Sequence, residues 1–288
     1  MKFAVIGGDM RIVAMACQLR REGHEVACFA LDKADPEALK CCAISAEKAA
    51  ENTDCVIFPL PVLNSQGLLN APLSNFSYSV EEILRALPQT AIVCAGKLNE
   101  KLIKIAEERG LTFVDYFERE ELVALNALAT AEGALSLLLR NSKITVWDSR
   151  VLVIGFGRIG RMLASRLRAL GAHVTVSARN AGDMAYIRAM GCAALDTRTL
   201  GAELRGFDTI INTVPARVLG ERQLENVAAE ALCIDLASRP GGIDMEAASR
   251  LNINAMWALG LPAETAPVTA GKIIKETVQN IMRELRPD

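Results

Sequence analysis

The stretch RVLVIGFGRIGRMLASRLRALGAHVTVSAR, from Arg150 to Arg179, constrains the fold of this chain more than any other. An apolar run leads into Gly155, Gly157 and Gly160, spaced as GxGxxG, and a helical apolar pattern and a second apolar run follow. Gly155 permits a tight turn, Gly157 lets a pyrophosphate approach the backbone, and Gly160 lets the helix pack closely on the strand. The order strand, turn, helix, strand therefore predicts a dinucleotide site; the alternative is that the glycines serve packing alone.

The end of the second strand indicates which dinucleotide is bound. A site that prefers NAD carries Asp or Glu about 20 residues beyond the turn, where it accepts hydrogen bonds from the ribose. Here the sequence reads Ser177-Ala178-Arg179-Asn180, without a carboxylate. A hydroxyl and a guanidinium suit the 2′-phosphate of NADP, because Arg offers charge-assisted donors. NADP is therefore the predicted cofactor; the alternative is that Arg179 is a solvated surface charge.

A later strand, residues 209–212, opens into Thr213-Val214-Pro215-Ala216. In nucleotide-binding sheets, the loop after this strand lies under the nicotinamide ribose. The predicted dinucleotide contacts are Gly155, Gly157, Arg158, Ile159, Gly160, Ser177, Arg179, Thr213, Val214 and Pro215.

The first 30 residues repeat the plan of the fingerprint stretch. KFAVIGGDMRIVAMACQLRREGHEVACFA again reads as strand, glycine turn, helix and strand. Asp9 stands where Gly157 stands, and Ile12 stands where Gly160 stands. A side chain and a negative charge then occupy the pyrophosphate position, so we expect no second nucleotide here.

Length and alternation predict the domain organisation. A chain of 288 residues exceeds the usual size of one domain. Strands alternate with helices throughout, which predicts an α/β fold of two Rossmann-like, doubly wound parallel-sheet domains joined by a long buried helix. The first domain spans residues 1–118, with the final helix 269–288 packing back on it. Residues 119–140 form the connecting helix, which is apolar nearly all round, and 141–268 form the NADP-binding domain.

Composition argues against some other functions. The formal charge of −2 and the even mixing of signs provide no basic stripe for nucleic acid. No uninterrupted apolar run reaches the roughly 18 residues of a membrane span, and Met1-Lys2 leads directly into a strand. We therefore expect a cytoplasmic protein that binds neither nucleic acid nor membrane.

Substrate contacts are expected at the carboxyl edges of the sheets, where the loops after parallel strands gather. Arg11 opens the first predicted helix, where the helix dipole favours anions and where a guanidinium can grip a carboxylate with two bonds; the alternative is a surface arginine paired with Asp9. Asn126 shares one face of the connecting helix with Thr130 and Gly133, and the partner of these polar groups could be the cleft, a ligand or the backbone. The substrate-binding candidates are Arg11, Lys97, Asn126, Arg239 and Thr269.

Cysteine and histidine usage indicates neither a metal site nor a histidine base. The eight cysteines include the adjacent pair Cys41-Cys42 but no CxxC spacing, so we expect reduced and mostly buried thiols. The only two histidines, His24 and His173, each sit between a helix-ending glycine and a strand, away from the carboxyl edges. A hydroxy-acid dehydrogenase that relies on histidine is thereby disfavoured, and the catalytic residue stays unknown.

Six segments resemble one family in this order: GGDMR, NALATAEGAL, GFGRIG, NTVPA, DLASRPGGID and LGLPAETAPVTAGKII. Together they are similar to the family of dipicolinate synthase A subunits over nearly the whole chain. The resemblance implies oxidation of dihydrodipicolinate, or its hydrated precursor, to pyridine-2,6-dicarboxylate with NADP. It also implies a role in the mother cell during sporulation and a flavoprotein-like partner, the B subunit of dipicolinate synthase; a homo-oligomer is expected as well.

Two other functions remain open from the residues alone. One is an NADP-dependent dehydrogenase of the shikimate or methylene-tetrahydrofolate type, which shares the architecture. The other is a non-catalytic nucleotide-binding subunit whose partner completes the active site. Turnover by the isolated chain distinguishes an enzyme from the second of these.

Overall fold

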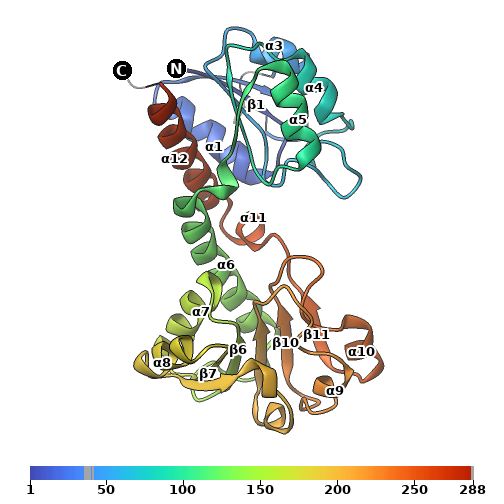
Figure 1. The fold of residues 1–288 in the computed structure, drawn as a ribbon, viewed down its shortest axis with the longest axis vertical. Coiled ribbons are helices and arrows are strands. Elements are labelled where there is room, and N and C mark those ends of the chain that lie inside the picture. Colours follow the sequence, from blue (N-terminus) through green and yellow to red (C-terminus); the bar gives the residue numbers. More distant parts are fainter. Residues whose placement is uncertain (36–39, 41, 287–288) are drawn as a thin grey trace. The chain divides into compact units, whose positions relative to one another are not determined.

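The computed structural model describes residues 1–35, 40 and 42–286, which form two compact units (Figure 1). The first unit comprises Met1–Asn126 and Ala266–Asp288, and the second comprises Ala127–Thr265. The division falls inside the long helix predicted at residues 119–140, so that this helix contributes residues to both units.

The first unit is built on a five-stranded parallel sheet in the order β2-β1-β3-β4-β5. Its strands are β1 (Lys2–Ile6), β2 (Glu25–Phe29), β3 (Cys55–Ile57), β4 (Ile92–Ala95) and β5 (Thr112–Asp115). The helices on one face are α1 (Met10–Arg21) and α12 (Pro267–Leu285), and those on the other are α3 (Ala46–Ala50), α4 (Val80–Ala86) and α5 (Glu100–Arg109). This is the flavodoxin-like strand order, whose switch point lies between β1 and β3.

Alternation along the strands builds two cores on this sheet. Phe3 and Val5 pack into the core under α1 and α12, whereas Ala4 and Ile6 pack into the core under α3, α4 and α5. Successive strand residues point to opposite faces, and helices cover both faces, so the strands read as continuous apolar runs.

Two apolar stretches of this unit form strands that are shorter than the stretches themselves. The mostly apolar stretch of residues 53–62 forms only β3, Cys55–Ile57, because Pro59 and Pro61 have no N–H to donate to a neighbouring strand. In the stretch of residues 111–117, strand β5 ends at Asp115 and the chain continues as the 3₁₀ turn Tyr116–Glu118. Asp115 accepts a hydrogen bond from the Phe117 amide at 2.8 Å, which starts that turn.

The second unit is built on a six-stranded parallel sheet in the order β11-β10-β9-β6-β7-β8. Its strands are β6 (Arg150–Ile154), β7 (His173–Ala178), β8 (Ala193–Asp196), β9 (Thr209–Asn212), β10 (Leu232–Asp235) and β11 (Asn254–Trp257). Numbered within the unit, this is the Rossmann order 3-2-1-4-5-6, with its switch point between β6 and β9. Both sheets are parallel and doubly wound, so the predicted fold class is confirmed.

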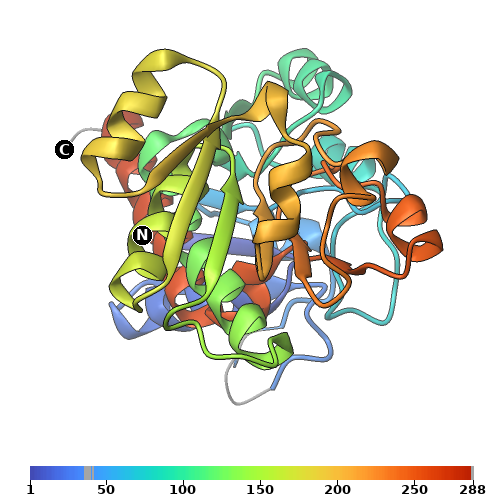
Figure 2. The same ribbon diagram turned by 90° about the horizontal axis from the view of Figure 1, so that it is seen from below.

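Helices cover both faces of the second sheet (Figures 1 and 2). On one face lie α7 (Arg158–Ala169) and α8 (Ala181–Ala189), and on the other lie α9 (Glu221–Leu224) and α10 (Met245–Arg250). A short helix, α11 (Leu261–Thr265), adds Leu261 to the core under α7. Between β8 and β9 the chain forms a 3₁₀ turn over Ala202–Gly206.

Helix α6 (Glu120–Asn141) reaches a mean hydropathy of 1.7, which by length and composition alone would suit a membrane span. Asn126, Thr130 and Glu132 interrupt its apolar residues, so it does not form the uninterrupted apolar run of about 18 residues considered above. Leu122 belongs to a core of the first unit, and Ala131, Ala134 and Leu138 belong to a core of the second. Core helices have this same composition, but only 44% of the apolar window of α6 is buried, and Leu125 and Leu139 are exposed.

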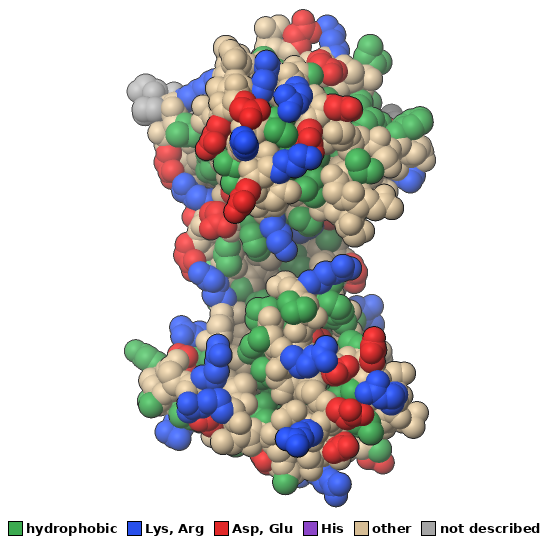
Figure 3. Space-filling view, turned by 45° about the vertical axis from the view of Figure 1, so that its right-hand side comes forward, with side chains coloured by type: hydrophobic (Ala, Val, Ile, Leu, Met, Phe, Trp, Pro, Cys, Tyr) green, Lys and Arg blue, Asp and Glu red, His purple; other side chains and the backbone are tan. Residues whose placement is uncertain are grey.

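The surface charges are mixed. On the face of each unit drawn in Figure 3, basic and acidic side chains are interspersed, in keeping with the formal charge of −2.

Candidate functional site

The glycine turn between β6 and α7 cannot accept side chains at two of its positions. Gly155 has φ +101°, a left-handed conformation, and a Cβ there would lie 2.5 Å from the Thr213 hydroxyl oxygen. A Cβ at Gly160 would lie 2.1 Å from the carbonyl oxygen of Gly155. Both glycines are therefore required for packing between the strand, the turn and the helix.

Gly157 differs, because packing does not explain it. It is the N-cap of α7 without a side-chain capping bond, and no heavy atom of the described residues lies within 4 Å of where its Cβ would be. The first amides of α7 thus face open space at the positive end of a helix dipole. An uncapped helix N-terminus with an open approach to the backbone fits a pyrophosphate.

At the end of β7, Ser177 and Arg179 lie in different environments. Ser177 is fully buried, and its hydroxyl oxygen accepts a hydrogen bond from the Thr197 hydroxyl at 2.9 Å. This burial does not agree with the predicted phosphate contact through Ser177, because β7 is an inner strand of a sheet covered on both faces and Thr197 lies against the hydroxyl. Arg179 is exposed, and within the described part of the chain its guanidinium makes no hydrogen bond or ion pair.

The loop after β9 is attached directly to the glycine turn. The Thr213 hydroxyl donates to the Ile154 carbonyl at 2.9 Å, and a Cβ at Gly155 would also contact Val214. Pro215 is exposed beyond them. The structure therefore brings Thr213, Val214 and Pro215 to the same switch point as the glycines.

Within the fingerprint itself, Arg158 is exposed and Ile159 is half-buried on the first turn of α7. Arg161, which the sequence reasoning missed, secures the turn. Its guanidinium carbon lies 4.6 Å from the centre of the Phe156 ring, and its Nε donates to the Phe156 carbonyl at 3.0 Å.

A buried polar pair adjoins this edge and was also missed. Asn212, at the end of β9, donates from Nδ2 to Asp235 Oδ1 at 2.7 Å, at the end of β10. Neither residue is exposed to solvent. A signal existed in the sequence, since two polar residues end otherwise apolar strands.

The corresponding turn of the first unit is capped by its own carboxylate. Asp9 is the N-cap of α1 and accepts from the Arg11 amide at 3.0 Å, so it occupies the position that stays open at Gly157. Its backbone is extended, like that of Gly157. The prediction that Asp9 replaces Gly157 in an equivalent turn agrees with this geometry.

Arg11 is held by this same carboxylate. Its Nε lies 3.0 Å from Asp9 Oδ1 and its Nη2 lies 2.8 Å from Asp9 Oδ2, while Nη2 also donates to the Leu60 carbonyl at 2.5 Å. The side chain is only 9% exposed. The two-bond grip predicted for a substrate carboxylate is thus already used by Asp9, which corrects that expectation.

Lys97 is better placed for a ligand. It has φ +62°, a left-handed conformation that is uncommon for residues other than glycine. Asp115 holds this conformation by accepting from the Lys97 amide at 3.0 Å and from the Leu98 amide at 2.7 Å. The ammonium group is exposed and has no partner among the residues that the structure describes.

The other substrate candidates are divided between the units. Thr269 is exposed on the first turn of α12, and Asn126 is half-buried on α6; like Arg11 and Lys97, they belong to the first unit. Arg239 belongs to the second unit and is exposed on the loop after β10, without a partner for its guanidinium in the described ranges.

Buried titratable groups of the first unit are not suited to acid or base catalysis near neutral pH. Burial raises the pKa of Tyr116 well above its usual range, and its hydroxyl donates to the Phe58 carbonyl at 2.9 Å. Burial likewise raises the pKa of the Cys55 thiol, whose sulfur lies 3.8 Å from that of Cys94. Cys41 lies outside the described residues, and Cys42 is exposed.

Both histidines lie at the amino edges of their sheets, opposite the carboxyl edges. His24 immediately precedes β2 and contacts the Phe3 ring edge-on, and His173 opens β7 with its Nε2 2.8 Å from Asp148. This agrees with the prediction that both histidines lie away from the carboxyl edges.

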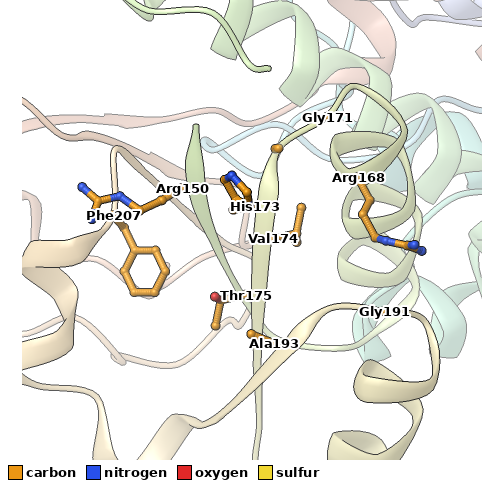
Figure 4. Close-up of a pocket in the computed structure, with 10 residues that line it drawn as sticks. Arg150, Arg168, Gly171, His173, Val174, Thr175, Gly191, Ala193 and Phe207 are labelled. Atoms are coloured by element: carbon orange, nitrogen blue, oxygen red, sulfur yellow. The ribbon is translucent and has the colours of Figure 1, made fainter. Parts of the chain in front are cut away.

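An open pocket of about 650 Å³ also lies at the amino edge of the second sheet, lined by Arg150, Arg168, His173 and Phe207 among others (Figure 4). The Arg150 and Arg168 side chains lie on opposite sides of it, and Arg168 donates to the Met190 carbonyl. Its polar groups do not converge, so the carboxyl edge is the better candidate site.

Comparisons with known proteins agree with this site. Residues 2–117 match the N-terminal domain of the dipicolinate synthase A subunit, and residues 138–248 match the NAD-binding domain of D-isomer-specific 2-hydroxyacid dehydrogenases. The second match covers the glycine turn and the loops after β7, β9 and β10. A nicotinamide dinucleotide cofactor and an oxidoreductase role are therefore supported.

Relatives match over the full length. The chain is 31% identical over 292 residues to the dipicolinate synthase A subunit of Bacillus subtilis (strain 168), covering 100% of this chain and 98% of that protein. The crystal structure of the dipicolinate synthase A subunit from Bacillus halodurans has a TM-score of 0.88 and 30% identity, covering 98% of this chain and 97% of that one. The corresponding structure from Bacillus subtilis has a TM-score of 0.86 and 30% identity, covering 99% and 96%. The resemblance in the sequence is thereby confirmed, and this chain belongs to the family of dipicolinate synthase A subunits.

Proposed function

We propose that this chain is an NADP-dependent oxidoreductase subunit that forms dipicolinate, pyridine-2,6-dicarboxylate, from dihydrodipicolinate or its hydrated precursor. Family membership supports the substrate class. The observation that carries the cofactor is Arg179, an exposed guanidinium without a partner in the described chain, at the strand end where an NAD site places a carboxylate.

The residues at the switch point divide the work of holding the dinucleotide. The open amides after Gly157 would receive the pyrophosphate, and Arg179 would bind the 2′-phosphate with charge-assisted hydrogen bonds. Thr213, Val214 and Pro215 would adjoin the nicotinamide ribose. When bound, NADP supplies the acceptor for the hydride that leaves the dihydro ring.

The substrate carries two carboxylates, so its recognition needs cations or hydroxyl groups. Lys97 and Arg239 are exposed on carboxyl-edge loops of their own units and have no partners in the described part of the protein. Thr269 and Asn126 are further candidates, whereas Arg11 would mainly hold Asp9.

Removing two hydrogens from the dihydro ring, as a hydride and a proton, makes the ring aromatic. The stability gained by aromatisation lessens the need for a strong base. The protein's contribution would then be mainly orientation.

We further propose that the protein acts in the cytoplasm of the mother cell during sporulation, as a homo-oligomer together with a flavoprotein-like B subunit. The designation of its relatives as A subunits supports a partner chain.

A second candidate function is a nucleotide-binding subunit whose partner supplies the reacting groups. The positions of His24 and His173 at the amino edges favour it, because they leave neither histidine near the carboxyl edge.

The decisive experiment incubates the purified chain with freshly generated dihydrodipicolinate and NADP while the pyridine absorbance is followed, with and without the B subunit. We expect the isolated chain to turn over the substrate. We also expect an Arg179→Ala variant to lose this activity when NADP is limiting. Turnover that appears only with the B subunit would support the nucleotide-binding role. A preference for NAD would contradict the cofactor assignment.

A further inference from the structure

We infer that Asp235 and Asn212 are a positioning pair that joins the loop after β9 to the loop after β10 and thereby sets the place of Arg239. This inference rests on the proposed dinucleotide function, because the loop after β9 is the one expected beside the nicotinamide ribose. Both side chains are fully buried at the ends of adjacent parallel strands, with Asp235 and Asn212 directly paired in register.

The carboxylate of Asp235 is saturated by donors from the loops. Its Oδ1 accepts from Asn212 Nδ2 at 2.7 Å and from the Ala237 amide at 3.0 Å. Its Oδ2 accepts from the amides of Gly242 and Ile243 at 2.7 and 2.9 Å. One side chain therefore fixes both ends of the loop that carries Arg239.

Asn212 holds the other loop. Its Nδ2 also donates to the Val214 carbonyl at 3.0 Å, and its Oδ1 accepts from the Val214 amide at 3.1 Å. The Gly242 carbonyl then accepts from the amides of Val218 and Leu219 at 2.9 and 3.0 Å. The Asp235–Asn212 pair and these two backbone hydrogen bonds together connect the loop after β9 to the loop after β10 on their buried side.

The arrangement requires an acceptor at 235 and glycine at 242. All four partners of the Asp235 side chain are N–H donors. In an Asp235→Asn variant, the amide NH₂ would therefore face two of these donors whichever way the side-chain amide is turned, and two hydrogen bonds would be lost. A Cβ at Gly242 would lie 2.2 Å from Asn212 Nδ2 and 2.6 Å from the Val214 carbonyl oxygen. Asp235→Asn and Gly242→Ala therefore disturb the same pair by independent means.

A tryptophan reports on the loop. Trp257 donates from Nε1 to the Ala237 carbonyl at 2.8 Å, and a Cβ at Gly241 would lie 3.2 Å from its ring. The only other tryptophan, Trp147, is 71% exposed. In a Trp147→Phe background, the emission of Trp257 thus follows the loop after β10 without any ligand.

The test compares two ligands in that background: NADPH, and 2′-phosphoadenosine diphosphoribose, which lacks only the nicotinamide. Asp235→Asn and Gly242→Ala are each expected to weaken NADPH about ten-fold, the scale of one buried hydrogen bond, and the fragment by less than about two-fold. Trp257 should become more accessible to acrylamide in both variants. Gly206→Ala is the matched control, because its Cβ would meet no heavy atom within 4 Å.

Equal losses for both ligands would overturn the inference, since they would mean general damage to the unit. Unchanged quenching of Trp257 in both variants would overturn it as well. If the parent protein binds neither ligand, the proposed dinucleotide function fails, and the Trp257 quenching by itself then decides whether the pair positions the loops. Gly242→Ala leaves the Asp235 carboxylate in place, so the comparison survives if Asp235→Asn does not fold.

Discussion

Replacing Gly157 by aspartate would give the second unit the cap that the first unit already has. No heavy atom of the described chain lies within 4 Å of a Cβ at Gly157, and its φ of −76° suits any residue. Asp9 shows the result of such a residue, because its carboxylate accepts from the second amide of α1 at 3.0 Å. The variant should therefore fold, and capping should stabilise it by about 0.3–1 kcal/mol.

Dinucleotide binding should be lost in the same variant. The new carboxylate would take amides that a pyrophosphate needs, and a lost charge-assisted hydrogen bond costs about 1.5–3 kcal/mol. Repulsion between the carboxylate and the phosphates adds to this, on the order of 1–4 kcal/mol for unit charges 4 Å apart in water or near a protein surface. The two costs together are at least about 2.5 kcal/mol, which corresponds to a loss of about 60-fold or more in affinity.

The assay is a fluorescence titration with NADPH beside a thermal melt of each protein. Gly157→Ala separates the two causes, because it blocks the backbone without adding charge, and it should lose less affinity than the aspartate variant. A Gly157→Asp protein that keeps NADPH affinity within about three-fold of the parent would refute the placement of the pyrophosphate.

Three further outcomes are expected. Arg179→Ala should weaken NADP by about 1.5–3 kcal/mol and NAD much less in calorimetric titrations, and equal losses would argue against the 2′-phosphate contact. Equilibrium titration should give one dinucleotide per chain, because Asp9 caps α1; two equivalent sites would contradict that reasoning. Glu22→Gln should lower the free energy of unfolding by about 1 kcal/mol after solvent screening, because it removes the charge partner of the buried Lys275. The hydrogen bond from Lys275 lowers the pKa of Glu22 below 4.5, so this contribution is fully present above pH 4.5 and is lost as the pH falls through the lowered pKa. Denaturant melts of parent and variant should therefore converge at low pH.

The parts of the fold that were predictable are those in which one local pattern decides the structure. The GxGxxG turn, the apolar strands around it and the replacement of Gly157 by Asp9 follow from residue type and spacing, and the structure has them at the expected positions. Short helices such as α3 and α10 were not predicted, since five or six residues carry too little periodicity. The order of the strands also depends on pairing between distant segments.

The parts of the site that were missed depend on the direction of side chains. Ser177 and Arg179 lie two residues apart at the end of one strand, yet the hydroxyl is buried against Thr197 while the guanidinium is exposed. Arg11 was expected to grip a ligand, but its partner is two residues away in the sequence. Which partner a polar side chain takes depends on the groups that surround it in the folded protein, and the spacing of residues in the sequence does not predict this.

The two units show how one local plan supports two roles. Each has a glycine turn between its first strand and first helix, with an extended N-cap residue. In the first unit a carboxylate fills the helix N-terminus and also holds Arg11 against the loop after β3, so the turn is closed by the protein's own charges. In the second unit, Gly157 leaves the N-terminus of α7 open. The buried carboxylate of this unit is Asp235, which accepts from the amides of Gly242 and Ile243 and so orders the loop after β10 without occupying the helix N-terminus. An internal carboxylate and an external phosphate would compete for the same helix N-terminal amides, so we expect Asp9 to exclude a dinucleotide from the first unit.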